Sequence, residues 1–118
     1  SLMAAYKTPE SADRAEAIEE ASKQATTVPL ETAEACLQVL EHATVVTELG
    51  NENAVTDGGT GALLTHAALQ AALYNVEINL ATIDDESFVA ETADRAEAIE
   101  EAADAALETV RSNVESVM

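Results

Sequence analysis

The fold is decided by one long, nearly uncharged stretch from Gly58 to Asn79, GGTGALLTHAALQAALYNVEIN. Apolar residues recur along it at helical spacing and on most sides, and Glu77 is its one formal charge. The glycines, with the polar segment Gly50–Asp57 before them, predict a loop that leads into a helix over Thr60–Ile83. A helix that is apolar nearly all round is buried in a bundle or at a subunit contact. The sequence therefore predicts a long central buried helix.

Before this helix, the sequence has helical patterns interrupted by proline and glycine. Ser1–Lys7 resembles the end of a helix, and Ser11 is the expected N-cap of a second helix that runs to about Thr26. Pro29 should stop or kink that helix, because proline has no N–H to donate. A two-sided apolar pattern then continues to Gly50, which is expected to end the helix in the left-handed conformation.

After the central helix, Asp84 is the predicted cap of a last long helix over about 85–117. Nowhere does the sequence show the alternation of apolar and polar residues that is typical of strands. A chain of 118 residues is long enough for one domain with a modest core. We therefore expect an all-α, antiparallel bundle of about four helices that forms a single domain over residues 1–118.

The chain is strongly acidic, with 23 Asp and Glu against five Lys and Arg, a formal net charge of −18. This charge would repel a phosphate backbone, and the chain has no Trp and three other aromatic residues for base stacking, so we expect no nucleic-acid partner. The acidic residues are spread along the whole chain, and their mutual repulsion is tolerated best where counter-ions are abundant. We favour a halophilic origin, the alternative being a soluble protein with ordinary Ala/Glu-rich helices.

The N-terminal residues, the central stretch and the single cysteine are those expected of a cytoplasmic protein. Ser1–Lys7 is too short for a signal peptide and lacks a basic start. The nearly uncharged central stretch has membrane length but is interrupted by His, Gln, Asn and Glu and has no flanking Lys or Arg, so no membrane span is expected. The single Cys36 cannot form an internal disulfide, which fits a reducing compartment, and we expect it to be a small core residue.

The central helix also carries amides in an apolar setting. Asn75 and Asn79 lie four residues apart and so share one helical face, where they could form a polar ligand pocket or bond a neighbouring helix. Apolar side chains on most sides of this helix exceed what one small chain can cover. The small residues Ala67, Ala68, Ala71 and Ala72 would let a second copy approach closely. We therefore expect a homodimer with this helix in its contact.

Several segments resemble, in order and in near-family spacing, the cyclodeaminase and methenyltetrahydrofolate cyclohydrolase family, which includes the cyclodeaminase half of formiminotransferase-cyclodeaminase. They are VPLETA at 28–33, GNENAVTD at 50–57, ALL at 62–64, NVEINL at 75–80 and DESFV at 85–89, and MAAYK at 3–7 resembles the segment before the family's connecting loop. The resemblance covers about three quarters of the chain and implies an all-α, usually dimeric enzyme acting on one-carbon forms of tetrahydrofolate. It also implies that this chain corresponds to the C-terminal part of the family's domain, without the upstream helices.

Within that resemblance, Asp57 is the candidate catalytic acid or base, and its alternative role is the N-cap of the central helix. Asn53, Asn75 and Asn79 would hydrogen-bond the edges of the pterin ring or fix Asp57, the alternative being structural bonds between helices. Tyr6 and Lys7 would meet the carboxylate of the substrate, although a lone Lys at a helix end is commonly solvated.

Two departures from the family remove cations. Glu77 stands where the family usually has a basic residue, and Ala81 stands where it often has a lysine. His66 is expected to be structural, and no cluster has the spacing of a metal site, so we expect neither a metal nor a cofactor besides the folate substrate. A non-catalytic helical self-association module, or an inactive fragment of such an enzyme, is the alternative function.

Overall fold

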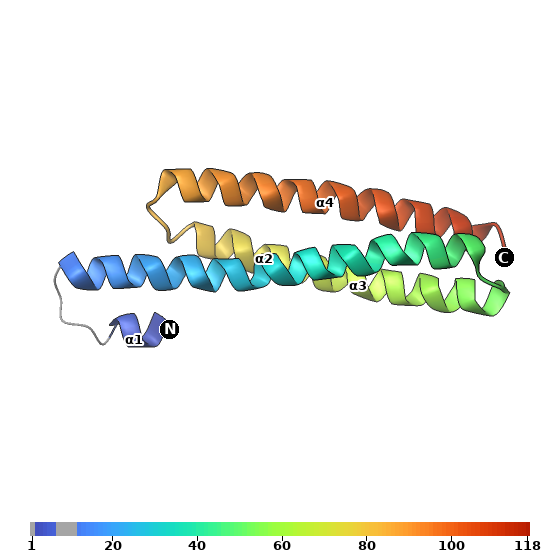
Figure 1. Cartoon of the computed structure of the whole chain (residues 1–118), viewed down its shortest axis with the longest axis horizontal. Helices are drawn as coiled ribbons and strands as arrows, with labels where there is room; N and C mark the ends of the chain where they lie inside the picture. Colours follow the sequence, from blue (N-terminus) through green and yellow to red (C-terminus); the bar gives the residue numbers. More distant parts are fainter. Residues whose placement is uncertain (1, 7–11) are drawn as a thin grey trace.

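The computed structural model describes residues 2–6 and 12–118, and all four of its elements are helices: α1 (Leu2–Tyr6), α2 (Ala12–Leu49), α3 (Glu52–Leu80) and α4 (Glu86–Glu115). The three long helices lie side by side in alternating directions, and the short α1 lies beside α2 (Figure 1). This arrangement confirms the predicted all-α antiparallel bundle of about four helices.

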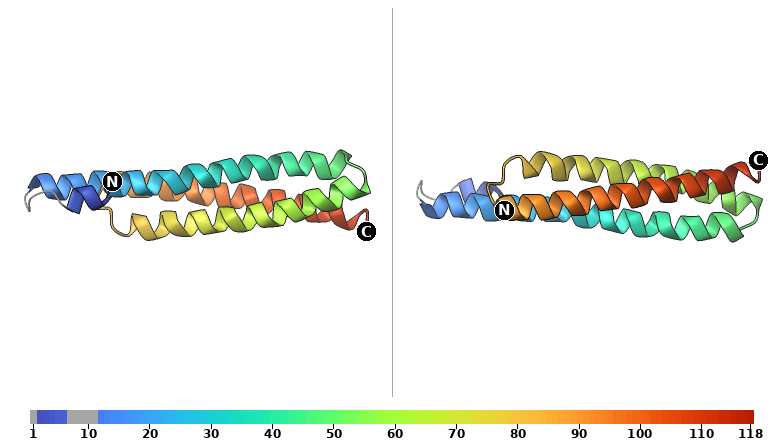
Figure 2. Two further views of the ribbon diagram at one scale, coloured as in Figure 1. Left: turned by 90° about the horizontal axis from the view of Figure 1, so that it is seen from below. Right: turned by 90° about the horizontal axis from the view of Figure 1, so that it is seen from above.

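The bundle is a long, thin rod rather than a sphere (Figure 2). Its principal extents are 62 × 23 × 15 Å and its radius of gyration is 18.5 Å. A compact domain of this length would have a radius of gyration of about 13 Å. A rod of three helices leaves the outer side of each helix without a partner from the same chain. None of the described helices is both long and apolar enough to span a bilayer.

Helix α2 runs without interruption through Pro29, so the predicted end near Thr26 and the predicted break at Pro29 are wrong. Proline removes the N–H that would bond the Ala25 carbonyl four residues earlier. In this structure that carbonyl accepts a hydrogen bond from Nδ2 of Asn79 on α3, at 3.0 Å. A side chain from the neighbouring helix thus replaces the lost backbone donor, and the helix continues.

Helix α3 begins at Glu52, eight residues before the predicted start at Thr60. The Asn51 side chain caps it by accepting the Ala54 N–H at 2.9 Å, and the connection to α2 is very short. The polar segment and the glycines predicted to form a loop are therefore helical. No glycine has a positive φ, so Gly50 is not the left-handed cap that the sequence suggested.

The glycines instead allow three helices to approach one another. A Cβ added to Gly58 would lie 3.0 Å from Cγ2 of Thr47 on α2, and one added to Gly59 would lie 2.6 Å from Cγ2 of Val114 on α4. Neighbouring positions on α3 therefore contact different helices. Gly61 is different, because a Cβ there would meet nothing within 4 Å.

The core runs along the contact of the three long helices. Five of its twelve residues are alanines, which keeps the helices close together. Cys36 is half-buried and packs against this core, as expected for a small core residue. The core residues are Leu30, Ala33, Leu40, Ala62, Leu69, Ala72, Leu73, Val76, Ile99, Ala103, Ala106 and Val110.

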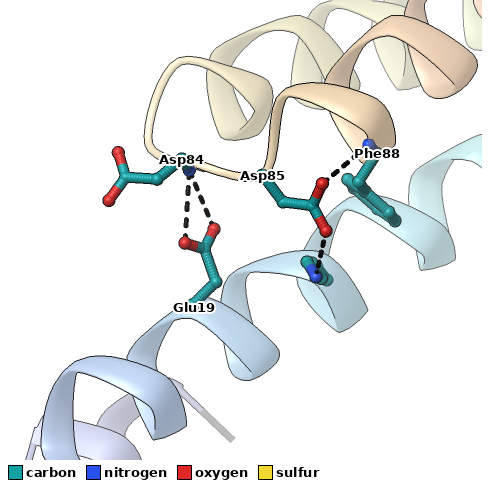
Figure 3. A network of polar contacts seen from close by, with 5 residues as sticks. Glu19, Asp84, Asp85 and Phe88 are labelled. Carbon is teal, nitrogen blue, oxygen red and sulfur yellow. Dashed lines mark hydrogen bonds and ion pairs between the residues drawn. The ribbon is translucent and has the colours of Figure 1, made fainter. Parts of the chain in front are cut away.

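Carboxylates fix the corner between α3 and α4 (Figure 3). Asp85 caps α4 by accepting the Phe88 N–H at 3.1 Å, so the cap lies one residue after the predicted Asp84. The other oxygen of Asp85 pairs with Lys23 of α2 at 2.7 Å, and this hydrogen bond lowers the pKa of Asp85 and raises that of Lys23. The Glu19 carboxylate accepts the backbone N–H of Asp84 at 2.9 Å. Both contacts tie the corner to α2.

One side of α3 is exposed. Leu64 is 69% exposed, Ile78 67% and Tyr74 64%. Among the described residues, the large exposed apolar side chains of the long helices all belong to α2 and α3, and none belongs to α4. Within the described residues, α2 and α4 therefore leave one side of the central helix uncovered.

The glycine contacts predict opposite effects for two single substitutions. Gly59→Ala should destabilise the protein by about 1–3 kcal/mol, because Val114 has one strongly preferred rotamer in a helix and the new methyl group can be accommodated only by moving α4. Gly61→Ala should stabilise it by about 1 kcal/mol, because alanine is the better helix former and nothing opposes its methyl group. Thermal unfolding followed by circular dichroism at fixed molar salt measures both. A rise in melting temperature for both variants would contradict the packing of α4 on Gly59.

Candidate functional site

The polar candidates on α3 form two groups at its two ends. Asn53 and Asp57 lie in its first two turns, and Asn75 and Asn79 lie in its last two. Asp57 and Asn75 are eighteen residues apart, which is five full turns, so they lie on the same face and about 27 Å apart. The structure therefore aligns the two groups but does not bring them together within one chain.

A groove between α2 and α3 holds Asn75 and Asn79. Its volume is about 460 Å³. Apart from the two amides and one threonine hydroxyl its walls are apolar, and none of its lining residues titrates. The groove can hold a polar ring by hydrogen bonds but has no acid or base of its own. It is lined by Ala25, Val28, Pro29 and Thr32 of α2 and by Ala68, Ala72, Asn75 and Asn79 of α3.

The two asparagines differ in what they have left to offer a ligand. Asn79 is half-buried and donates one N–H to the Ala25 carbonyl, which Pro29 leaves without its backbone donor. That N–H therefore forms a bond between helices, the alternative to binding a ligand. Its amide oxygen and second N–H are not used in this bond. Asn75 is exposed and forms no hydrogen bond with another described residue. Pro29 and Asn79 thus hold this part of the groove in place, and the Asn75 amide is available to hydrogen-bond a ligand.

Asp57 is exposed in the second turn of α3 and forms no hydrogen bond or ion pair within the described part of the chain. Because Asn51 is the N-cap, the alternative role of Asp57 as the cap is wrong. Asn53 is exposed one turn earlier. Nothing in the fold of one chain uses the Asp57 carboxylate, which leaves it available for chemistry.

The remaining candidates lie away from the groove. Tyr6 is the last residue of α1, and Lys7 lies outside the described residues. Glu77 does not line the groove; it lines a separate cavity between α3 and α4, together with Glu97 and Glu100. The loss of a cation at position 77 therefore leaves the walls of the groove unchanged. Within residues 2–6 and 12–118, no three His, Cys, Asp or Glu side chains are grouped in the manner of a metal site.

His66 has the structural role that the sequence suggested. Its Nε2 lies 2.8 Å from Oδ1 of Asp104 on α4, and its side chain is only 19% exposed. It is nine residues, or two and a half turns, from both Asp57 and Asn75, so it lies on the opposite side of α3 from them. It joins α3 to α4 and takes no part in the candidate site.

The sequence and fold match known proteins over nearly the whole chain. The formiminotransferase-cyclodeaminase family model matches residues 1–98. A methenyltetrahydrofolate cyclohydrolase from Methylorubrum extorquens is 36% identical over 120 residues, a match that covers 98% of this chain and 58% of the relative. The crystal structure of a formiminotetrahydrofolate cyclodeaminase from Thermotoga maritima superposes with a TM-score of 0.88 at 28% identity, covering 98% of this chain and 56% of that one.

This chain thus spans a little more than half the length of the two relatives. The matches to both of them cover the three long helices and the groove between α2 and α3. The family resemblance noted in the sequence is confirmed by all three comparisons. The chain belongs to the formiminotransferase-cyclodeaminase family.

Proposed function

We propose that this protein acts on a one-carbon derivative of tetrahydrofolate. The observation that carries the proposal is the 36% identity with a methenyltetrahydrofolate cyclohydrolase, which extends over 98% of the chain. That relative favours hydrolysis of a methenyl bridge as the reaction, with the enzyme a hydrolase. The close fold of a formiminotetrahydrofolate cyclodeaminase favours a second candidate, ring closure with loss of ammonia, with the enzyme a lyase.

Both reactions need a group that moves protons. In hydrolysis a base removes a proton from water as the oxygen attacks the methenyl carbon. One carbon–nitrogen bond then breaks to leave a formyl group, as the hydroxyl loses its proton and the released nitrogen takes one up. In ring closure N10 attacks the formimino carbon and loses its proton, and the leaving amine takes one up as ammonia departs. Asp57 is our candidate for this proton transfer, because its carboxylate is exposed and has no structural partner.

The amides would bind the substrate. Asn75 and Asn79 offer donors and acceptors to the edge of a pterin ring from the groove. Asn53 lies about 33 Å from Asn75 along α3, so within one chain it would not contact the same ring. We assign Tyr6 and Lys7 to the carboxylate of the folate, as the resemblance implies. We propose that the reaction requires no metal or cofactor besides the folate.

A second candidate function is a helical self-association module without catalysis. The observations that favour it are the exposed apolar side chains of α2 and α3 and the lack of a titratable group among the residues that line the groove. Substrate turnover separates the two candidates.

We further propose that the protein is a cytoplasmic homodimer adapted to high salt. The exposed face of α3 has no Asp, Glu, Lys or Arg between Gly58 and Val76, whereas α4 is acidic along its length. Two copies that carry a net charge of −18 each would meet with least repulsion through such an uncharged face.

Replacement of Asp57 tests the proposed chemistry. Asp57→Asn keeps the size and polarity of the side chain but cannot transfer a proton, so turnover of methenyltetrahydrofolate should fall about 100-fold or more. The melting temperature should stay unchanged, because the Asp57 carboxylate has no partner in the fold. Loss of the near-ultraviolet absorbance of the substrate measures turnover, and Asp94→Asn, at an exposed position on α4, is the matched control.

Full activity of Asp57→Asn would remove Asp57 from the mechanism. No turnover by the unmodified chain in molar salt would contradict catalysis by this chain and favour the alternative, a self-association module or an inactive fragment of such an enzyme.

Salt tests the proposed halophilic adaptation. At molar ionic strength charges are screened beyond about 3 Å, which should relieve the repulsion among the acidic side chains. Helicity and melting temperature should therefore rise steeply between low and molar KCl, as followed by circular dichroism. A flat response would contradict the halophilic origin.

A charge placed on the exposed face of α3 tests the homodimer. Ala68 is exposed near the middle of that face, so Ala68→Glu should convert the dimer into a monomer by burying an unpaired carboxylate. Ala102→Glu adds the same charge on the exposed side of α4 and should leave the dimer intact. Light scattering in molar salt reports the mass. A monomer mass for the unmodified chain at micromolar concentration would refute the dimer.

A further inference from the structure

We propose that Pro29 is a positioning residue for ligand binding, which fixes the orientation of the Asn79 amide in the groove between α2 and α3. This inference rests on the proposed function and adds a residue to it. Pro29 and Asn79 both line the groove, and the Ala25 carbonyl connects them. Proline cannot donate to this carbonyl, and Nδ2 of Asn79 does so at 3.0 Å. The proline therefore acts on the ligand through the asparagine.

The Ala25 carbonyl decides which way the Asn79 amide points. An asparagine amide carries an acceptor and a donor group and can turn over to exchange them. A carbonyl oxygen accepts hydrogen bonds and never donates them, so only the nitrogen of Asn79 can face Ala25. The amide oxygen is then directed away from this carbonyl. Asn75 is different, because it is exposed and forms no hydrogen bond with another described residue that would fix its orientation.

The proline ring makes the carbonyl available in two ways. In a regular helix the N–H of residue 29 would bond the Ala25 carbonyl, and proline has no N–H. The ring also clashes with a carbonyl four residues earlier that keeps its regular direction, so this carbonyl must turn outward. Helix α2 nevertheless continues to Leu49, so the available carbonyl lies inside a helix rather than at its end.

The end of α3 is held to α2 independently of this hydrogen bond. At the corner that follows α3, Lys23 pairs with Asp85 at 2.7 Å, and the Glu19 carboxylate accepts the N–H of Asp84 at 2.9 Å (Figure 3). These contacts keep the backbone of α3 in place when the proline is replaced. A replacement should therefore turn the Asn79 side chain without separating the two helices.

A fixed amide selects the chemistry of the ligand. The Asn79 oxygen requires an N–H on the edge of the ligand, and the remaining N–H of the amide requires an acceptor. A lactam or aminopyrimidine edge, such as that of a pterin ring, carries both groups side by side. A ring edge with acceptors alone would leave the Asn79 oxygen unpaired and would bind more weakly. Asn79 is thus the amide that discriminates between ligands, whereas Asn75 can adapt to either kind of group.

Pro29→Ala tests the orientation without any ligand. Alanine restores the N–H four residues after Ala25, so the carbonyl turns back to its own helix and the Asn79 amide is released. In the unmodified chain, nuclear magnetic resonance should show one of the two Nδ2 protons of Asn79 protected from exchange with solvent. In Pro29→Ala both protons should exchange at similar rates. Unchanged protection in Pro29→Ala would overturn the positioning role.

Stability and affinity should change in opposite directions in Pro29→Ala. The melting temperature should rise by about 4 °C or more, because alanine is the better residue inside a helix. The dissociation constant for methenyltetrahydrofolate should rise about 5-fold, because a mobile amide must be ordered on binding. Gly61→Ala is the matched control: it also favours the helix, with nothing within 4 Å of the new methyl group, and should leave the dissociation constant unchanged. An unchanged dissociation constant in Pro29→Ala would overturn the proposal.

A double-mutant cycle shows whether Pro29 acts through Asn79. Asn79→Ala should weaken binding about 10-fold. Addition of Pro29→Ala should then have no further effect, because no amide is left to orient and the restored N–H bonds the Ala25 carbonyl. Additive losses would overturn the positioning role and make Pro29 a direct contact of the ligand. If the unmodified chain did not bind methenyltetrahydrofolate, the proposed function would fail, whereas the exchange of the Asn79 protons would still decide whether Pro29 orients the amide.

Discussion

The close approach of α2 and α4 to the first turns of α3 is the constraint on which the rest of this structure depends. Gly58 faces Thr47 of α2 and Gly59 faces Val114 of α4; a methyl group at Gly59 would require Val114 to move, and one at Gly58 would lie tightly against Thr47. Alanines continue the close packing along the core. Small residues bury little apolar area each, so the bundle must be long to gain enough stability.

Pro29 connects the fold of the bundle with the candidate binding site. A proline inside a 38-residue helix leaves one carbonyl without its usual donor, and Asn79 supplies the missing hydrogen bond. The same bond holds α2 and α3 together at the groove and fixes one of its two amides. A residue that seemed to interrupt the helix therefore helps to shape the candidate binding site.

Much of the fold follows from the apolar spacing in the sequence, and the errors share one cause. The helical pattern and the incomplete cover of the central helix were both predicted. Glu52–Gly59 was wrongly predicted as a loop, because glycines and amides favour turns locally, whereas contacts with Thr47 and Val114 favour glycine inside the helix. The break at Pro29 was wrong because its compensation comes from Asn79, fifty residues later in the chain. Such contacts leave no local signal in the sequence.

The candidate site was predictable in its residues but not in its arrangement. Asp57 and the amides were identified from the resemblance to the family, yet only the early start of α3 shows that Asp57 and Asn75 share one face five turns apart. The most direct test of this account is a titration of the protein with methenyltetrahydrofolate, followed by nuclear magnetic resonance. The side-chain amides of Asn75 and Asn79 should shift together with one dissociation constant. Shifts confined to the cavity between α3 and α4, with none in the groove, would contradict it.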